Sequence, residues 1–222
     1  MHAPNRTRFK ICCISSIDEA KLAVAYGASA LGLVASMPSG PGVISESLIA
    51  EIARTIPPGV ASFLLTSHQN VADIINQQRR CGVNTVQIVD NLTSGTHQDL
   101  RAALPGIALV QVIHVLGDES IEEARQVAPH VNAILLDSGN PKLATKELGG
   151  TGRTHNWQIS RQIREAVDVP LYLAGGLNAD NVADAIAMVH PFGVDICSGV
   201  RTDGNLDEAK LAAFSSNVSK SA

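Results

Sequence analysis

The chain has 222 residues, of which 45% are hydrophobic and 17% are charged, and its net charge is −4. This length and composition indicate a soluble globular protein with a substantial buried core. Aromatic residues make up only 3%, so Ala, Val, Ile and Leu must fill most of that core. No long basic or acidic run is present, which argues against a nucleic-acid groove and against a membrane-binding surface.

The first residues, MHAPNRTR, are polar and lead directly into an apolar run. They lack the apolar segment of a secretion signal, and no run elsewhere is long enough to span a bilayer. The four cysteines, Cys12, Cys13, Cys81 and Cys197, do not have the spacing of metal ligands. We therefore expect free thiols in a protein of the reducing cytoplasm.

Eight short apolar runs are predicted to be strands, and segments with apolar residues at helical spacing separate them. In chain order the predicted strands are Arg8–Ile14, Ala30–Val34, Val60–Leu65, Thr85–Val89, Ile107–His114, Val131–Leu136, Val169–Leu173 and Gly193–Cys197. Many are continuously apolar, which is typical of parallel strands buried on both faces. The chain is therefore predicted to be α/β, a single (β/α)8 TIM barrel domain over residues 1–222 with a short polar tail at 1–7. A doubly wound open sheet is the alternative, because counting elements does not show closure.

In such a barrel the chemistry lies at the carboxyl ends of the strands. Three glycine-bearing loops follow the late strands, and glycines let the backbone approach an anion closely. One such loop alone is explained equally well by a tight turn, but three together predict a phosphate site. Its predicted residues are Gly150, Thr151, Gly152, Gly175, Gly176, Ser198 and Gly199. Asn178 is expected to cap the helix after the seventh strand.

Asp137 follows the apolar run NAILL, so loss of water around its carboxyl group should raise its pKa and suit it to act as a general acid. The alternative is a carboxylate that only caps a turn. Lys10 and Cys12 are two residues apart on a strand and share one face, whereas Cys13 is expected to face the surrounding helices. A buried Lys10 needs an acidic partner from a neighbouring strand, and its charge would favour the thiolate of Cys12. The alternative is that Cys12 is simply a small buried apolar residue.

The segments KICCIS, LLDS, GGTGRTHNW, LAGGLNADNVADAI and VDICSGV resemble, in order, the motifs of the phosphoribosylanthranilate isomerase family of tryptophan biosynthesis. The resemblance covers nearly the whole chain. It implies a (β/α)8 barrel that needs no metal or organic cofactor, with Cys12 as general base, Asp137 as general acid and the three glycine loops holding a phosphate. The implied reaction is an Amadori rearrangement of a phosphorylated N-substituted ribosylamine. The implied partner is a small phosphosugar, and the chain is expected to be a monomer or homodimer.

The sequence departs from the family pattern where the aromatic acid would bind. Gly42 stands where the family has an arginine that would pair with the anthranilate carboxylate, Val89 replaces a histidine, and Cys13 replaces a glycine. His114 or Arg201 could supply the missing contact, so the predicted substrate-binding residues are Lys10, Gln87, His114 and Arg201. Two alternatives stay open: an isomerase for a different N-substituent, and a non-catalytic phosphometabolite-binding protein.

Overall fold

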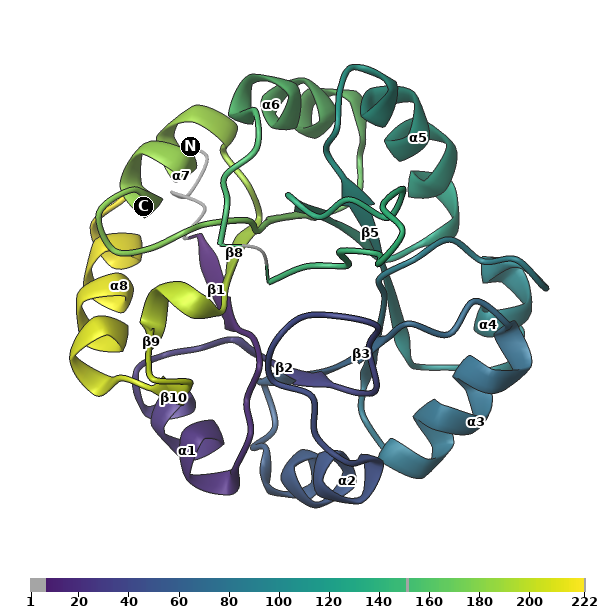
Figure 1. Ribbon diagram of the computed structural model, residues 1–222, viewed down its shortest axis with the longest axis horizontal. Coiled ribbons are helices and arrows are strands. Elements are labelled where there is room, and N and C mark those ends of the chain that lie inside the picture. Colours follow the sequence, from purple (N-terminus) through teal and green to yellow (C-terminus); the bar gives the residue numbers. More distant parts are fainter. Residues whose placement is uncertain (1–6, 151, 222) are drawn as a thin grey trace.

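The computed structural model describes residues 7–150 and 152–221. Its centre is a closed barrel of eight strands in the order β1 to β8, and helices surround it (Figure 1). The strands are β1 Arg8–Ile11, β2 Ala30–Val34, β3 Ala61–Thr66, β4 Thr85–Ile88, β5 Ala108–His114, β6 Ala133–Asp137, β7 Leu171–Leu173 and β8 Gly193–Ile196. Every neighbouring pair is parallel, including β8 with β1, where Phe9 lies opposite Val194. Closure confirms the predicted (β/α)8 TIM barrel and excludes the open sheet.

A helix follows each strand of the barrel. The helices are α1 Ile17–Ala25, α2 Glu46–Thr55, α3 Val71–Cys81, α4 His97–Ala103, α5 Glu119–Val127, α6 Trp157–Ala166, α7 Val182–Val189 and α8 Glu208–Lys220. Local sequence signals set many of their ends. The Ser45 side chain caps α2 by accepting from the Leu48 N–H, and α3 ends at Gly82, which adopts a left-handed conformation. None of the described helices has the length and apolar character that crossing a membrane would require.

Residues along each strand alternate between two apolar layers. On β2, Ala30 and Val34 belong to the cluster inside the barrel, whereas Leu31 and Leu33 belong to the larger cluster between barrel and helices. All four side chains are buried. This two-sided burial is why the strand sequences are apolar throughout rather than alternating.

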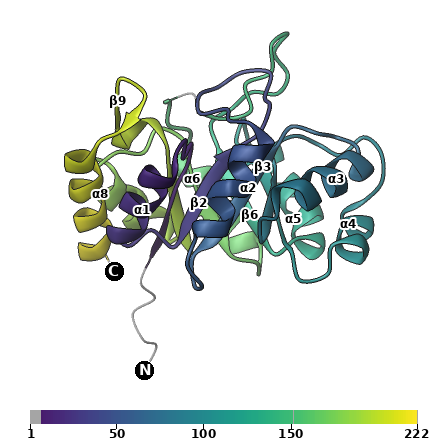
Figure 2. The same ribbon diagram turned by 90° about the horizontal axis from the view of Figure 1, so that it is seen from below.

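The loops that follow β2 and β6 are long and project from the same end of the barrel (Figure 2). They span residues 35–45 and 138–156. A short hairpin that the sequence reading missed lies at this end as well, formed by β9 Arg201–Thr202 and β10 Asn205–Leu206. Its turn contains Asp203 and Gly204, a common hairpin signal. These segments enclose the region where the carboxyl ends of the strands meet.

The first strand is shorter than predicted, because it ends at Ile11 rather than Ile14. Cys13 has a φ of 62°, in the left-handed region that side chains other than glycine seldom adopt. The chain therefore turns immediately after Cys12. The expectation that Cys13 faces the helices is wrong for this reason: its side chain belongs to the cluster inside the barrel.

Candidate active site

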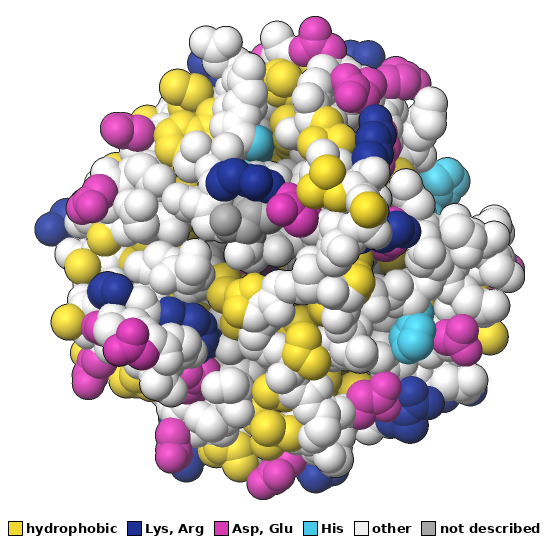
Figure 3. Space-filling view, viewed as in Figure 1, with side chains coloured by type: hydrophobic (Ala, Val, Ile, Leu, Met, Phe, Trp, Pro, Cys, Tyr) yellow, Lys and Arg dark blue, Asp and Glu magenta, His cyan; other side chains and the backbone are white. Residues whose placement is uncertain are grey.

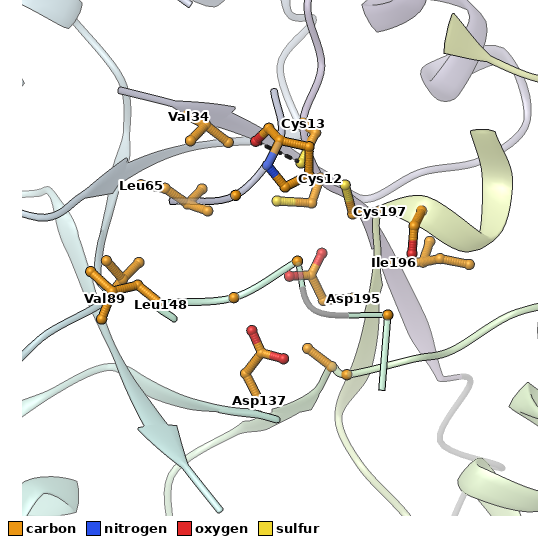
Figure 4. Close-up of a pocket in the computed structure, with 18 of the residues that line it drawn as sticks. Cys12, Cys13, Val34, Leu65, Val89, Asp137, Leu148, Asp195, Ile196 and Cys197 are labelled. Atoms are coloured by element: carbon orange, nitrogen blue, oxygen red, sulfur yellow. Dashed lines mark hydrogen bonds between the residues drawn. The ribbon is translucent and has the colours of Figure 1, made fainter. Parts of the chain in front are cut away.

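A cavity opens at the carboxyl end of the barrel and encloses about 700 Å³ of empty space, including the part open to solvent. Figure 3 looks onto this end, where white and yellow atoms dominate the centre and most charged side chains lie farther out. Many of the residues predicted from the sequence come together around the cavity (Figure 4). They are Cys12, Gln87, Asp137, Gly150, Gly152, Gly175, Gly176 and Ser198.

The remaining predicted site residues lie elsewhere. Lys10, His114, Arg201 and Gly199 are not among the described residues that line the cavity, and Thr151 lies outside the described residues. Gly199 instead sits against the carbonyl group of Leu177, which leaves no room for a Cβ atom.

The structure places His114 and Arg201 away from the cavity for identifiable reasons. His114 Nε2 is 3.0 Å from the carbonyl oxygen of Val89, and the ring lines a smaller neighbouring cavity. The Arg201 guanidinium pairs with Glu19 at 2.9 Å and donates to the carbonyl oxygens of Gly204 and Cys13. Arg201 therefore ties the β9–β10 hairpin to the turn after β1.

Asp137 is the last residue of β6, and the residue is only 8% exposed. Burial raises its pKa, although the Ser138 N–H, which donates to Oδ1 at 2.7 Å, acts in the opposite direction. Gly149 lies over the other oxygen, where a Cβ atom would come within 2.7 Å of Oδ2. This close approach requires a glycine, and it helps to exclude water from the carboxyl group.

Lys10 has the acidic partner that the sequence analysis required. It is fully buried, lies opposite Asp195 in the register of β1 and β8, and donates to Asp195 Oδ2 at 2.7 Å. Burial lowers the pKa of Lys10, but attraction to Asp195 and to the nearby thiols outweighs it, so the pKa is raised. Lys10 therefore stays charged inside the barrel.

Sequence analysis did not identify Asp195 as a site residue. It lines the cavity, and within the described part of the chain its buried Oδ1 has no hydrogen-bond partner. A buried acceptor of this kind is costly unless a ligand or water satisfies it. Asp195 therefore presents one oxygen to Lys10 and the other to the cavity.

Three thiols, those of Cys12, Cys13 and Cys197, line one side of the cavity. Interactions with the thiols of Cys12 and Cys197, together with burial, raise the pKa of Cys13, and the Cys13 thiol donates to the carbonyl oxygen of Pro41 at 3.7 Å. Interaction with Cys13 lowers the pKa of Cys197, against the effect of burial and helped by the charge of Arg201. Cys12 Sγ and Lys10 Nζ both border the space in front of Gly32, so the ammonium group lies beside the Cys12 thiol.

The predicted phosphate residues form one end of the cavity. Gly152 of the loop after β6 faces Ser198, with Ser198 Oγ 3.8 Å from where a Cβ of residue 152 would lie. The prediction that Asn178 caps the following helix is wrong by one turn. Asn181 precedes α7, and the Asn178 side chain instead accepts from the N–H groups of Asp180 and Asn181.

The other side of the cavity is apolar. Val34, Leu65, Val89 and Leu148 lie there, and the close-up shows Val89 and Leu148 across the cavity from Ile196 and Cys197 (Figure 4). A ligand with a phosphate in the glycine loops would thus direct its other end toward this slot, which suits a flat apolar group. The slot is defined here by these four residues.

The model of the N-(5'-phosphoribosyl)anthranilate isomerase family matches residues 9–217. The chain belongs to this family. It is therefore an isomerase, as the resemblance implied.

Curated relatives of this isomerase family align with almost the whole chain. N-(5'-phosphoribosyl)anthranilate isomerase 2 of Methanosarcina mazei is 34% identical over 93% of this chain and 92% of its own length. The enzyme of Haloferax volcanii is 35% identical over 94% and 91%. The crystal structure of phosphoribosyl anthranilate isomerase from Thermotoga maritima superposes with a TM-score of 0.79 at 29% identity, covering 96% of this chain and 98% of that one.

A further solved structure of a phosphoribosyl anthranilate isomerase superposes with a TM-score of 0.77 at 27% identity over 96% of this chain and 98% of that one. That protein was crystallised with reduced 1-(o-carboxyphenylamino)-1-deoxyribulose 5-phosphate.

Gly42, the expected position of the family arginine, is sterically coupled to Cys13. Gly42 has a φ of +78°, and a Cβ there would lie 2.4 Å from the Cβ of Cys13. The side chain of Cys13 therefore occupies the space that a side chain at position 42 would need.

This contact makes a prediction about stability. Gly42→Ala should lower the free energy of unfolding by about 2–4 kcal/mol, from left-handed backbone strain plus the clash. In a Cys13→Gly background the clash with the Cβ and Sγ atoms disappears, so the cost should fall by about 1–2 kcal/mol, while backbone strain and the 2.9 Å approach to the Cα of residue 13 remain. Urea unfolding of the two single variants and the double variant measures the coupling. Equal costs of Gly42→Ala in both backgrounds would contradict the steric link.

Proposed function

We propose that this chain converts N-(5'-phosphoribosyl)anthranilate to 1-(o-carboxyphenylamino)-1-deoxyribulose 5-phosphate, an Amadori rearrangement in tryptophan biosynthesis. The substrate phosphate is bound by backbone N–H groups of the glycine loops and by Ser198, and the aryl group enters the slot. Family membership supports the reaction class, and the shape of the cavity supports this orientation of the substrate.

In the first step Asp137 acts as general acid. Its carboxyl group gives a proton to the ribose ring oxygen, the bond between C1 and that oxygen breaks, and the nitrogen lone pair forms a protonated Schiff base at C1. The raised pKa of the buried Asp137 supports this role, because an acid must hold its proton at working pH. The ring oxygen becomes the free C4 hydroxyl group.

In the second step the thiolate of Cys12 removes the proton from C2. The electron pair of the C2–H bond forms a C1–C2 double bond, and the imine nitrogen becomes neutral. The resulting enolamine tautomerises when the C2 hydroxyl loses its proton and C1 gains one, so substrate and product are isomers. Lys10 beside Cys12 supports this assignment, since a cation stabilises a thiolate.

Asp195 and Gln87 would hold the sugar between these two groups. Within the described residues, Asp195 Oδ1 and Gln87 Oε1 are buried acceptors without a partner, and both residues line the cavity. Ribose hydroxyls are donors that would satisfy them. The observation that carries the proposal is this combination of a buried acid, a thiol beside a cation, and two free acceptors around one cavity.

An isomerase for a different N-substituent is the second candidate, because Gly42 takes the place of the family arginine. One assay distinguishes the two. Purified protein is mixed with N-(5'-phosphoribosyl)anthranilate, and loss of the substrate's fluorescence is followed. Turnover, together with growth of a tryptophan auxotroph that lacks this isomerase, supports the proposal. Absence of turnover, with retained binding of a ribose-phosphate analogue, overturns it in favour of another substrate or of a binding protein.

A further inference from the structure

The cavity contains carboxylates but lacks an obvious partner for a substrate carboxylate. Its described lining residues include Asp137 and Asp195 and no lysine or arginine. The proposed substrate carries a carboxylate on its aromatic ring. An anion moved from water into such a site is costly unless a cation or several donors meet it. A cation that meets this carboxylate must therefore reach the slot from outside the described lining.

Three of the basic residues around the cavity are unsuited to this task. Lys10 and Arg201 are held in the ion pairs described above, Lys10 fully buried under the sugar position. Arg153 belongs to the opposite end, because its main chain lies against Gly176 in the phosphate region, and its side chain pairs with Glu147. The loop after β6 is therefore the remaining source of a cation for the slot.

Lys146 belongs to that loop and lies two residues before Leu148 of the slot. Its carbonyl oxygen accepts a hydrogen bond from the Ser39 hydroxyl at 2.6 Å, and both Ser39 and Leu148 line the cavity. Its ammonium group lies 2.5 Å from Oδ2 of Asp90, the residue that follows Val89 of the slot. The pair thus bridges the loops after β4 and β6, next in sequence to Val89 and two residues before Leu148, and Asp90 itself lines the smaller neighbouring cavity.

In the Lys146–Asp90 pair, the lysine side chain has room to change conformation, whereas the aspartate side chain is held in place. The Lys146 side chain is 39% exposed, whereas that of Asp90 is 7% exposed. Asp90 Oδ1 also accepts from the Asn91 N–H at 2.8 Å, so the carboxylate keeps a donor when the ammonium turns away. The ammonium has three donors, and Asp90 is the one side-chain partner recorded for it in the described chain. A second carboxylate can therefore share it.

We propose that Lys146 binds the carboxylate of the substrate's aromatic ring and determines specificity for it, its ammonium turning from Asp90 toward the slot or bridging the two carboxylates. This rests on the proposed function. It gives the site a cation from the loop after β6 in place of one at position 42, where Cys13 leaves no room for a side chain.

The test compares two pairs of ligands, and the members of each pair differ only in this carboxylate. The substrates are N-(5'-phosphoribosyl)anthranilate and N-(5'-phosphoribosyl)aniline, and the non-reacting ligands are their reduced 1-arylamino-1-deoxyribulose 5-phosphates. Lys146→Met should lower kcat/KM for the carboxylate substrate roughly 10–100-fold, mainly through KM, and weaken the carboxylate analogue equally. Both ligands without the carboxylate should change less than about threefold. Lys146→Arg should retain most of the preference.

Lys142→Met is the matched control, because it removes the same charge from the same loop. It should leave the preference between the two ligands unchanged. The proposal is overturned if Lys146→Met affects both ligands equally, or if Lys142→Met has the same selective effect. Calorimetric binding of the two analogues separates this proposal from the proposed function. Wild-type protein that prefers the carboxylate analogue but turns over neither substrate contradicts only the function, and equal turnover of both substrates contradicts only the role of Lys146.

Discussion

Cys12→Ser is expected to lower kcat for N-(5'-phosphoribosyl)anthranilate by about 10²–10⁴-fold, the range that a well-placed general base contributes. A serine hydroxyl fits the same space but gives up its proton far less readily than a thiol. Binding of the reduced product analogue should change little, because the loss concerns proton transfer rather than contact. Steady-state kinetics and calorimetry measure the two effects separately.

The neighbouring thiols make this experiment discriminating. Cys13→Ser and Cys197→Ser change the other two thiols among the described lining residues, and Cys197 is the one whose pKa is lowered. Cys81→Ser is the control, since Cys81 is fully buried at the end of α3, outside the cavity. Loss of turnover in Cys197→Ser combined with an active Cys12→Ser would transfer the role of base to Cys197.

The position of Cys13 next to Cys197 bears on how those variants should be interpreted. The Cys13 thiol donates to the carbonyl oxygen of Pro41 at 3.7 Å, and its interaction with Cys197 lowers the pKa of Cys197. A serine at position 13 can still donate, so Cys13→Ser should preserve the arrangement. Cys13→Ala removes the thiol and should therefore raise the pKa of Cys197. A turnover deficit in Cys13→Ala that is absent in Cys13→Ser would therefore also point to Cys197.

Much of the site could be predicted because the barrel brings distant segments to one end. Cys12, Asp137 and the glycine loops each follow an apolar run, and the carboxyl ends of all parallel strands in a closed barrel lie together. Identifying the strands was therefore enough to group these residues. This grouping did not require exact strand ends. Although β1 ends at Ile11, earlier than predicted, Cys12 still lies at the same end of the barrel as the other site residues.

Other features depend on contacts that no local pattern encodes. Asp195 lies in the interior of an apolar strand, and its importance follows from its register opposite Lys10, 185 residues earlier in the chain. The left-handed backbone of Cys13 is equally hidden, because cysteine gives no signal for positive φ. The Lys146 contacts join loops after three different strands. Such pairings depend on tertiary packing, so the sequence predicted which strand-end residues come together better than it predicted the contacts around them.

Asp137→Asn is expected to reduce kcat by about 10²–10⁴-fold, because an amide fills the same space but cannot protonate the ring oxygen. The pH profile of the wild type gives a second measure. Burial raises the pKa of Asp137, and an acid works only while protonated. Activity should therefore decline as the pH rises through this raised pKa, on the alkaline side of where an exposed aspartate titrates.

The neighbouring carboxylate of Asp195 offers a second test of this decline in activity at high pH, the alkaline limb of the pH profile. Asp195 also faces the cavity, and its negative charge contributes to the raised pKa of Asp137, whereas Lys10 opposes it. Asp195→Asn removes that charge, so it should shift the alkaline limb of kcat toward lower pH while leaving Asp137 in place. In Asp137→Asn, the residual activity should instead no longer decline on the alkaline side of the pH profile. An unchanged limb in Asp137→Asn, or a variant that keeps more than about a tenth of wild-type kcat, would mean that another group protonates the sugar.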